Sequence, residues 1–392
     1  MLQPAGAPAR PALIKPVPLN RTFRSPDPRP SPIKPPERCP HCNSGRLIKK
    51  GARQKKLERV PLYRCRACGR TFTPGPRAVR NKTYPVNEIL EALTLYDRGN
   101  TLEETARTIS SRHGHPVAPS TISRWLSEHP ALTTYRRLRA RGRRLFTPTQ
   151  VIRAHKLYHR QVYDFALHRA KLAFLRNGSL DEKRAATAAS TARFATLANF
   201  LESVPTACPH DLFRREDGAR GSQLDPAFIN GSDRLVVFER QNTATETAAL
   251  ILPSVGTNYE RHPKLQRFML ANDSTTIAVE VPIWLHAEDI AAIERRWDIE
   301  LFPKAATAPS EREARSITGH IDFLQIRNGA IHILDYKPDA TTGKPFAQLT
   351  LYALALSHLT GIPLFDFKCA WFNERQYCEF FPRTVLARKN AR

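Results

Sequence analysis

Three residues in the last third of the sequence have the types and spacing that metal-assisted chemistry requires. Asp335 and Lys337 stand two positions apart at the end of an apolar run, and Asp322 precedes them. Alternate residues of a strand point to the same face, so the carboxylate and the ammonium group would lie together. Carboxylates can bind Mg²⁺ (or Mn²⁺), which activates a water molecule for phosphodiester hydrolysis, and a nearby lysine can stabilise the developing charge. An ordinary ion pair at a strand end explains Asp335 and Lys337 equally well.

Four cysteines near the start of the chain form a second group with chemical meaning. They are arranged as two CxxC pairs: Cys39, Cys42, Cys65 and Cys68. Each CxxC turn can present two thiolates to one metal ion, and the stretch between the pairs is long enough for a hairpin. We therefore predict a structural Zn²⁺ site in a zinc ribbon over residues 37–78. The intervening hairpin is basic and could lie along a nucleic-acid backbone through Lys49, Lys50, Arg53, Lys55, Lys56 and Arg59.

A β-hairpin is expected to position the acidic residues of the first group. Residues 319–326 and 330–337 read as strands joined by the Asn-Gly turn at 328–329. A two-residue turn places Asp322 directly opposite Asp335, where the two side chains are close. Two facing carboxylates repel each other unless a cation offsets their charge.

The elements around this hairpin complete a compact α/β unit. Residues 277–284 read as a further strand, and residues 345–359 as an amphipathic helix whose Leu349, Leu356 and Leu359 would face the core. Two closing strands are expected over 365–372 and 376–381.

The order of these motifs resembles the RecB-like branch of the PD-(D/E)XK nuclease superfamily. The resemblance covers residues 256–384 and rests on Gly319-His320-Ile321-Asp322, Asp335-Tyr336-Lys337, and Gln348 with Tyr352. It implies a restriction-endonuclease-like α/β core with a mixed sheet and deoxyribonuclease activity. Asp322 and Asp335 would then bind the metal ion and Lys337 would activate water. Gln348 and Tyr352, one helical turn apart, would face the metal and the scissile strand.

The resemblance also implies a metal ligand upstream of Asp322. Some members of the family bind an iron–sulfur cluster as well, so the cysteines must be considered. If this ligand is acidic, Glu280 is the candidate, and if it is a histidine, His262 is the candidate. The Tyr336 carbonyl would complete the coordination shell of the metal ion. Some relatives hold an iron–sulfur cluster through four cysteines. Only Cys208, Cys369 and Cys378 remain here, so no such cluster is expected.

Residues 83–130 are expected to form a helix-turn-helix domain. Thr101 and Glu104 make a capping box, and a turn with Gly114 separates that helix from one beginning at Pro119. Small polar side chains and one arginine would face the major groove: Ser120, Thr121, Ser123 and Arg124. With the zinc ribbon, this stretch resembles the N-terminal region of insertion-sequence transposases. A plain three-helix bundle that contacts protein is the alternative.

The charge of the chain is concentrated in its first half. Residues 1–170 hold 34 Lys and Arg against 10 Asp and Glu, whereas residues 171–392 hold 27 against 26. Clustered positive charge suits nucleic acid, although solubility alone could account for it. Residues 1–36 are rich in Pro and are expected to be disordered, and residues 131–255 are expected to form a basic helical linker.

These observations lead to one function and two rivals. The favoured function is a DNA-binding, Mg²⁺-dependent nuclease of the cytoplasm or nucleoid, with no signal peptide and no membrane span. A non-catalytic DNA-binding regulator that uses the nuclease fold as a scaffold is the alternative. The third hypothesis is a nuclease that serves a mobile element beside a separate recombinase. A homodimer is left open.

Overall fold

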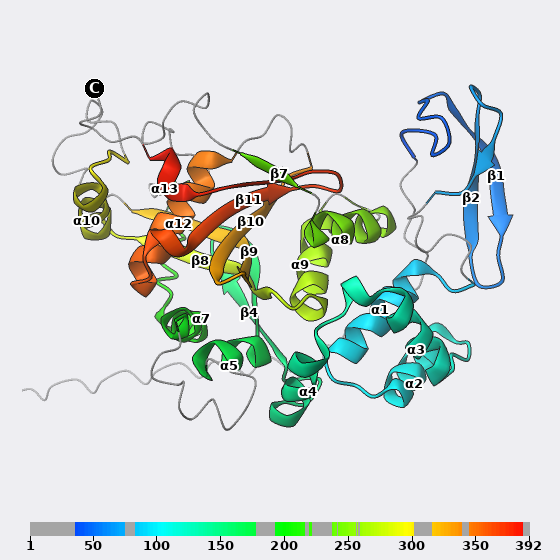
Figure 1. Ribbon diagram of the computed structural model, residues 1–392, viewed down its shortest axis with the longest axis horizontal. Coiled ribbons are helices and arrows are strands. Elements are labelled where there is room, and N and C mark those ends of the chain that lie inside the picture. The colour runs from blue at the N-terminus through cyan, green and yellow to red at the C-terminus, as the bar shows by residue number, and fades with distance from the viewer. Residues whose placement is uncertain are drawn as a thin grey trace, which may run out of the picture. The chain divides into compact units, whose positions relative to one another are not determined.

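The computed structural model describes most of the chain after its Pro-rich start (Figure 1). The described residues are 36–74, 83–177, 193–215, 219–221, 237–240, 242–255, 257, 259–301, 316–338 and 345–386. The tail predicted over residues 1–36 therefore lies outside them, except for its last residue. Among the described residues, no helix is both long and apolar enough to cross a membrane.

The cysteine-bearing segment forms a small antiparallel sheet. Its strands, in the order β1-β2-β3, are Leu47–Gln54, Arg59–Cys65 and Thr71–Phe72. Tyr63 and Phe72 stack on each other and, with Cys39 and Cys65, make up the buried core of this unit. Because so small a core buries little apolar surface, the unit needs a further cross-link to be stable, and a metal ion is the usual one.

The next segment contains the three expected helices. They are α1 (Val86–Asp97), α2 (Leu102–His113) and α3 (Pro119–Glu128). The predicted capping box is present, because Thr101 accepts from the Glu104 amide and Glu104 accepts from the Thr101 amide. Gly114 ends α2 in the left-handed conformation that glycine adopts without strain.

The largest unit is a nine-stranded mixed sheet in the order β4-β5-β8-β9-β10-β11-β12-β7, with β6 beside β9. The pairs β10–β11 and β6–β9 are parallel and the others are antiparallel. The strands are β4 (Ile152–Tyr158), β5 (Val162–His168), β6 (Ala219–Arg220), β7 (Phe238–Arg240), β8 (Thr276–Leu285), β9 (Ile317–Arg327), β10 (Ala330–Tyr336), β11 (Phe367–Phe372) and β12 (Tyr377–Phe380). The strands expected after residue 276 are all confirmed.

The helical linker predicted over residues 131–255 is wrong in its middle. Residues 152–158 and 162–168 are strands that extend the main sheet beyond β8, and residues 219–220 and 238–240 add two more. The sheet therefore draws on a much longer part of the chain than residues 256–384.

Helices cover both faces of this sheet (Figure 1). One core packs α5 (Arg169–Asn177), α7 (Ala195–Ala207), α10 (Ala287–Trp297) and α12 (Phe346–Thr360) against it. A second core on the other face contains α8 (Thr243–Ile251) and α9 (Arg261–Asn272) and joins them to α1 and α3. The remaining helices are α4 (Arg136–Leu145) and α13 (Pro382–Val385), with short 3₁₀ turns at Pro130–Leu132, Leu252–Ser254 and Leu364–Asp366.

The helix α12 differs from its sequence-based description, and the basic helix α4 has one arginine with a structural role. The helix α12 is not amphipathic: apolar residues are buried all around it, including Leu351, Leu354 and Ala355, because other elements surround it. The basic helix α4 is only partly a solvated face. Its Arg139 stacks on the Tyr96 ring at 3.5 Å and donates to backbone carbonyls of α1 and the turn after it, so this arginine is a structural cross-link.

Candidate active site

Three carboxylates occupy facing positions on three neighbouring strands. The β9–β10 register runs from Arg327↔Ala330 to Phe323↔Leu334. Continued by one residue it sets Asp322 opposite Asp335, as the two-residue turn predicted, and the two carboxyl groups interact. The β8–β9 register places Glu280 opposite Asp322, between two paired neighbours. Glu280, Asp322 and Asp335 therefore form a row across β8, β9 and β10.

The backbone is strained at the first member of this row. Glu280 has φ of 50°, in the left-handed region, although it lies inside β8 and is not glycine. Such a conformation costs on the order of 1 kcal/mol or more and survives only where the surrounding structure enforces it. Strained residues of this kind cluster at functional sites.

Asp335, near the end of β10, forms an ion pair with Lys337, which directly follows the strand. The Lys337 Nζ lies 2.9 Å from the Asp335 Oδ2. The Asp335 residue is only 4% exposed, whereas the Lys337 side chain is 35% exposed. Burial works to lower the pKa of Lys337, but the Asp335 charge outweighs it and raises that pKa, so the lysine stays a cation. The pair has the buried carboxylate and accessible ammonium group that a metal-assisted site needs.

Helix α9 contributes two further side chains. The His262 Nδ1 lies 3.3 Å from the Asp322 Oδ2, and the Gln266 amide donates to the Glu280 carboxylate at 2.8 Å. Burial opposes a charge on His262, but its hydrogen bond with Asp322 and the charge of that carboxylate raise the pKa of the imidazole. His262 and Glu280, the two candidates for the upstream ligand, thus both lie at Asp322.

The three carboxyl groups differ in pKa. Burial, and next the charge of Asp322, raise the pKa of Glu280 and of Asp335 to about 8 each. Burial would also raise the pKa of Asp322, but the hydrogen bond and charge of His262 lower it. Burial and a neighbouring negative charge thus favour the neutral form of two of the three carboxyls.

Helix α12 brings Gln348 and Tyr352 to the same place. The Gln348 amide donates to the Tyr352 hydroxyl at 3.1 Å. The Tyr352 ring lies so close to β9 that a Cβ on Gly319 would be 2.5 Å from its Cε1, and one on Gly221 would be 2.7 Å away. Glycine at these two positions is what lets the tyrosine approach the sheet.

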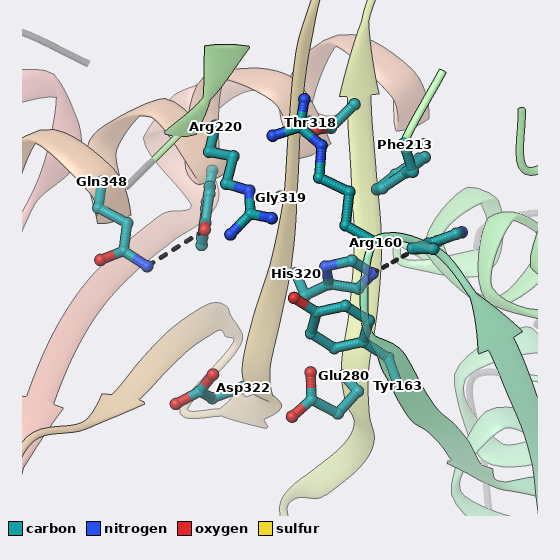
Figure 2. A pocket seen from close by; sticks show the side chains of 12 residues that line it. Arg160, Tyr163, Phe213, Arg220, Glu280, Thr318, Gly319, His320, Asp322 and Gln348 are labelled. Carbon is teal, nitrogen blue, oxygen red and sulfur yellow. Dashed lines mark hydrogen bonds between the residues drawn. The ribbon is translucent and has the colours of Figure 1, made fainter. Parts of the chain in front are cut away.

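These residues line a cavity of ≈ 210 Å³ (Figure 2). Glu280, Asp322, Gln348 and Tyr352 border it, together with side chains that our sequence interpretation missed: His159, Arg160, Tyr163, Phe213, Arg220 and His320. Two arginines beside two carboxylates give the cavity groups for both a phosphate and a cation. The residues of the β4–β5 hairpin carried no clear sequence signal, because most of β4 is exposed, and nothing local marked Arg220.

Tyr336 is the remaining residue that was predicted to bind the metal ion, through its backbone carbonyl. Its side chain is buried and donates through the hydroxyl to Glu374 at 3.2 Å, while its backbone N–H lies 3.4 Å from the Asp322 Oδ2. The role of its carbonyl as a metal ligand stays a prediction.

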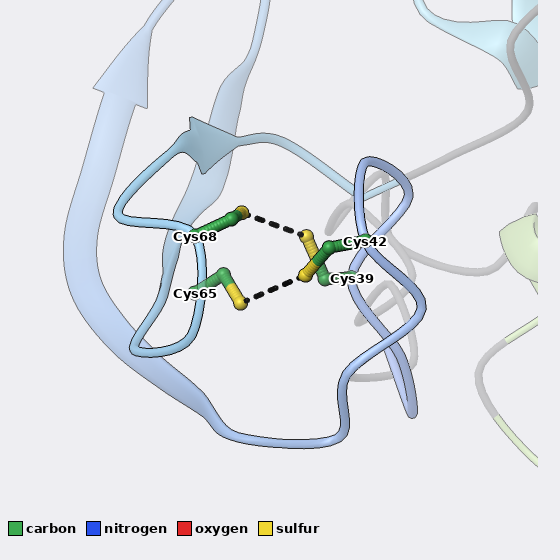
Figure 3. Close-up of side chains that lie close together, drawn as sticks. All are labelled: Cys39, Cys42, Cys65 and Cys68. Carbon is green, nitrogen blue, oxygen red and sulfur yellow. Dashed lines mark hydrogen bonds between the residues drawn. The ribbon is translucent and has the colours of Figure 1, made fainter.

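The four N-terminal cysteines come together from two loops (Figure 3). The Cys39 and Cys68 sulfurs are 3.7 Å apart and the Cys42 and Cys65 sulfurs 3.5 Å apart. The four sulfurs all lie within 4.8 Å of one another, and four cysteine sulfurs are a common ligand set for a structural zinc ion. The cluster therefore suits Zn²⁺.

The residues predicted to contact DNA are mostly accessible. On α3, Ser120, Ser123 and Arg124 are exposed, and Thr121 is half-buried. On the β1–β2 hairpin, the basic side chains Lys49, Lys50, Arg53, Lys56 and Arg59 are exposed. Lys55 differs, because it pairs with Glu58 at 2.6 Å.

Comparison with protein families identifies the C-terminal part of the chain. The model of the PD-(D/E)XK nuclease superfamily matches residues 239–375, so this part is a domain of that superfamily. The match contains the acidic row, Lys337, Gln348 and Tyr352. Searches of curated proteins and of solved structures returned no match.

Proposed function

We propose that the PD-(D/E)XK nuclease superfamily domain at residues 239–375 makes this protein a Mg²⁺-dependent deoxyribonuclease. The observation that carries the proposal is the row Glu280, Asp322 and Asp335 with Lys337 at its end. A scaffold without activity would have no need for three crowded carboxylates, a strained backbone and a paired lysine at one place.

The residues present fit a divalent cation. Burial, and next the charge of Asp322, raise the pKa of Glu280 and Asp335 to about 8, and a cation among these groups would favour their charged forms. Carboxylate oxygens are the ligands that Mg²⁺ prefers. Asp322, Asp335 and Glu280 would hold the ion, with His262 orienting Asp322. When bound, the ion would supply an activated water and charge neutralisation.

The other residues would position the phosphate and its nucleophile. Lys337 keeps its proton through Asp335, so its ammonium group can orient water and stabilise negative charge on the phosphate. Arg220 and Arg160 border the cavity and offer positive charge to the DNA backbone. Gln348, held by Tyr352, presents an amide beside the same cavity.

The first half of the chain supports DNA as the substrate. Exposed basic side chains on β1 and its turn suit phosphate contacts, and the exposed face of α3 suits the major groove. We propose that these units hold duplex DNA for the nuclease domain. Service to a mobile element, beside a separate recombinase, is the biological setting that the transposase-like N-terminal half suggests.

A nicking assay with supercoiled plasmid and Mg²⁺ tests the proposal. Lys337→Met should reduce cleavage at least a hundredfold, because it removes a charge that acts on the reacting phosphate. Lys368→Met is the matched control: Lys368 is also a strand lysine beside a carboxylate, 3.8 Å from Glu379, but lies on β11. Equal cleavage by wild type and Lys337→Met would overturn the assignment. DNA binding without cleavage by the wild type would favour the regulator instead.

A further inference from the structure

A second group of metal-binding residues lies beside the cavity, outside the acidic row. His159 is in the turn between β4 and β5, and Cys208 and His210 follow α7. The ligand atoms of these three side chains all lie within 4.8 Å of one another. Cys208 is buried, and the two histidines are half-buried.

The distances between the atoms approach those of a tetrahedral zinc site. The His159 Nε2 is 3.0 Å from the His210 Nδ1 and 3.9 Å from the Cys208 Sγ. Typical Zn–N and Zn–S bonds at tetrahedral angles would separate two nitrogens by about 3.4 Å and a nitrogen from a sulfur by about 3.6 Å. Small side-chain rotations would therefore bring all three atoms to one ion.

The other ring nitrogen of His159 has a partner of its own. The His159 Nδ1 lies 2.9 Å from the Nε2 of His320, which is on β9 two residues before Asp322. Metal-binding histidines commonly donate their second ring N–H to an acceptor that fixes the tautomer and the ring orientation. His320 is placed to be that acceptor.

Aromatic rings hold both imidazoles in position. The Phe213 ring stacks on His159, with 4.0 Å between centroids, and the Tyr163 ring stacks on His320 at 3.6 Å. These contacts fix the orientation of the two rings before any ion binds, which lowers the entropy lost on binding.

We propose that His159, Cys208 and His210 bind a zinc ion, with His320 as the outer-shell partner of His159. Two imidazoles and a thiolate are a ligand set that Zn²⁺ favours over Mg²⁺, so the ion would differ from that of the acidic row. Three protein ligands leave a fourth position for water or another ligand. Binding converts the Cys208 thiol to a thiolate and releases its proton.

The ion would tie the segment after α7 to the β4–β5 hairpin. The stacking of Phe213 on His159 and the hydrogen bond from Arg214 to the Tyr158 carbonyl already join these segments, and the ion would add a metal-ligand link. Because His159 also contacts His320, the zinc ion would fix one wall of the cavity that contains Asp322. The site itself does not depend on the nuclease assignment, since metal content can be measured without any cleavage.

Zinc content of the full chain, measured by mass spectrometry after loading with Zn²⁺ and removal of the excess, tests the proposal. The double variant Cys208→Ser/His210→Ala should hold one zinc ion per chain fewer than the wild type. Cys369→Ser/His358→Ala is the matched control, because it removes a buried thiol and an imidazole outside the group and should leave the zinc content unchanged. Equal zinc content in the wild type and the Cys208 variant would overturn the proposal.

Two single variants keep the test decisive if the double variant does not fold. His210→Asn changes a half-buried turn residue and should also lower the zinc content by one ion per chain. His320→Gln should leave the ligands intact but weaken zinc binding roughly 10- to 100-fold, the range typical of a lost outer-shell partner. Unchanged zinc affinity in both variants would show that the histidines form only a hydrogen-bonded chain.

Discussion

Asp322 lies between Glu280 and Asp335, two carboxyl groups with raised pKa values. The effect of a cation on this group of side chains can be measured. The charge of Asp322 is held by His262, and this charge raises the pKa of both neighbours. A cation bound by all three would stabilise the folded state by mass action, because the unfolded chain does not preserve the row.

We therefore predict that Mg²⁺ raises the melting temperature of the wild type but not that of Asp335→Asn. At a concentration 100 times the dissociation constant, the stabilisation of the wild type would be about 2.7 kcal/mol. Differential scanning fluorimetry with and without Mg²⁺ measures this shift. Asp289→Asn, which changes a carboxylate paired with His358 away from the row, should keep the full shift. An equal shift in Asp335→Asn would exclude Asp335 as a ligand.

Gly319 leads to a second prediction at this scale. A Cβ at this position would lie 2.5 Å from the Tyr352 ring, and the ring cannot retreat because it is buried on α12. Gly319→Ala should therefore reduce the free energy of unfolding by about 1–3 kcal/mol, as overpacking does. Urea denaturation checks the value. Gly45→Ala, where the added Cβ meets only a carbonyl at 3.6 Å, should change stability far less.

At the scale of elements, a buried lysine fastens α5 to the end of α9. The Lys171 Nζ donates to the carbonyls of Leu270 and Thr276, at 2.8 Å each, and lies 3.8 Å from Asp273. Burial lowers the pKa of this fully buried lysine from 10.5 to about 8, although Asp273 opposes the shift. The folded state therefore holds this proton less tightly than the unfolded state does.

Because the folded and unfolded states bind this proton with different pKa values, the stability of the fold depends on pH. Below pH 8 both states are protonated, and the cost of burying the charge, on the order of 3 kcal/mol, is fully present. As the pH rises from about 8 to 10.5, the folded state loses the proton first and this cost disappears. We predict that the stability of the wild type, relative to Lys171→Met, increases across this window. Urea denaturation of both proteins at several pH values tests it, and a parallel pH dependence would contradict it.

Much of the acidic site could be predicted from the sequence because its members are fixed by local rules. The Asn-Gly turn sets the register that opposes Asp322 and Asp335, and helical spacing brings Gln348 to Tyr352. The strand β4 was missed because most of its residues are exposed, so it lacks a continuous apolar pattern. His159 and His210 meet only through tertiary packing of segments 51 positions apart, for which no local signal exists.

At the scale of the whole molecule, the sheet of the superfamily domain includes strands from the preceding sequence. The family match covers residues 239–375, so a fragment with these bounds lacks the strands β4, β5, β6 and β12. It would also lack α5 and α7, whose apolar side chains fill one of the two main cores.

We predict that the fragment 239–375 is insoluble or aggregated, because β8 would present an unpaired edge and an uncovered apolar face. A fragment of residues 83–392 retains all of these elements and should be monodisperse and folded. Size-exclusion chromatography with limited proteolysis compares the two. A stable, protease-resistant 239–375 fragment would show that the added strands are accessory.

The left-handed backbone at Glu280 bears on how this protein could be engineered. Glycine adopts φ of 50° without steric strain, and Glu280→Gly would also remove one of the crowded carboxyls. Glu280→Gly would therefore relieve the backbone strain, but it would also remove a proposed metal ligand. A laboratory selection for thermal stability alone would favour such a substitution at the expense of the proposed activity. Each round of selection should therefore also measure DNA cleavage.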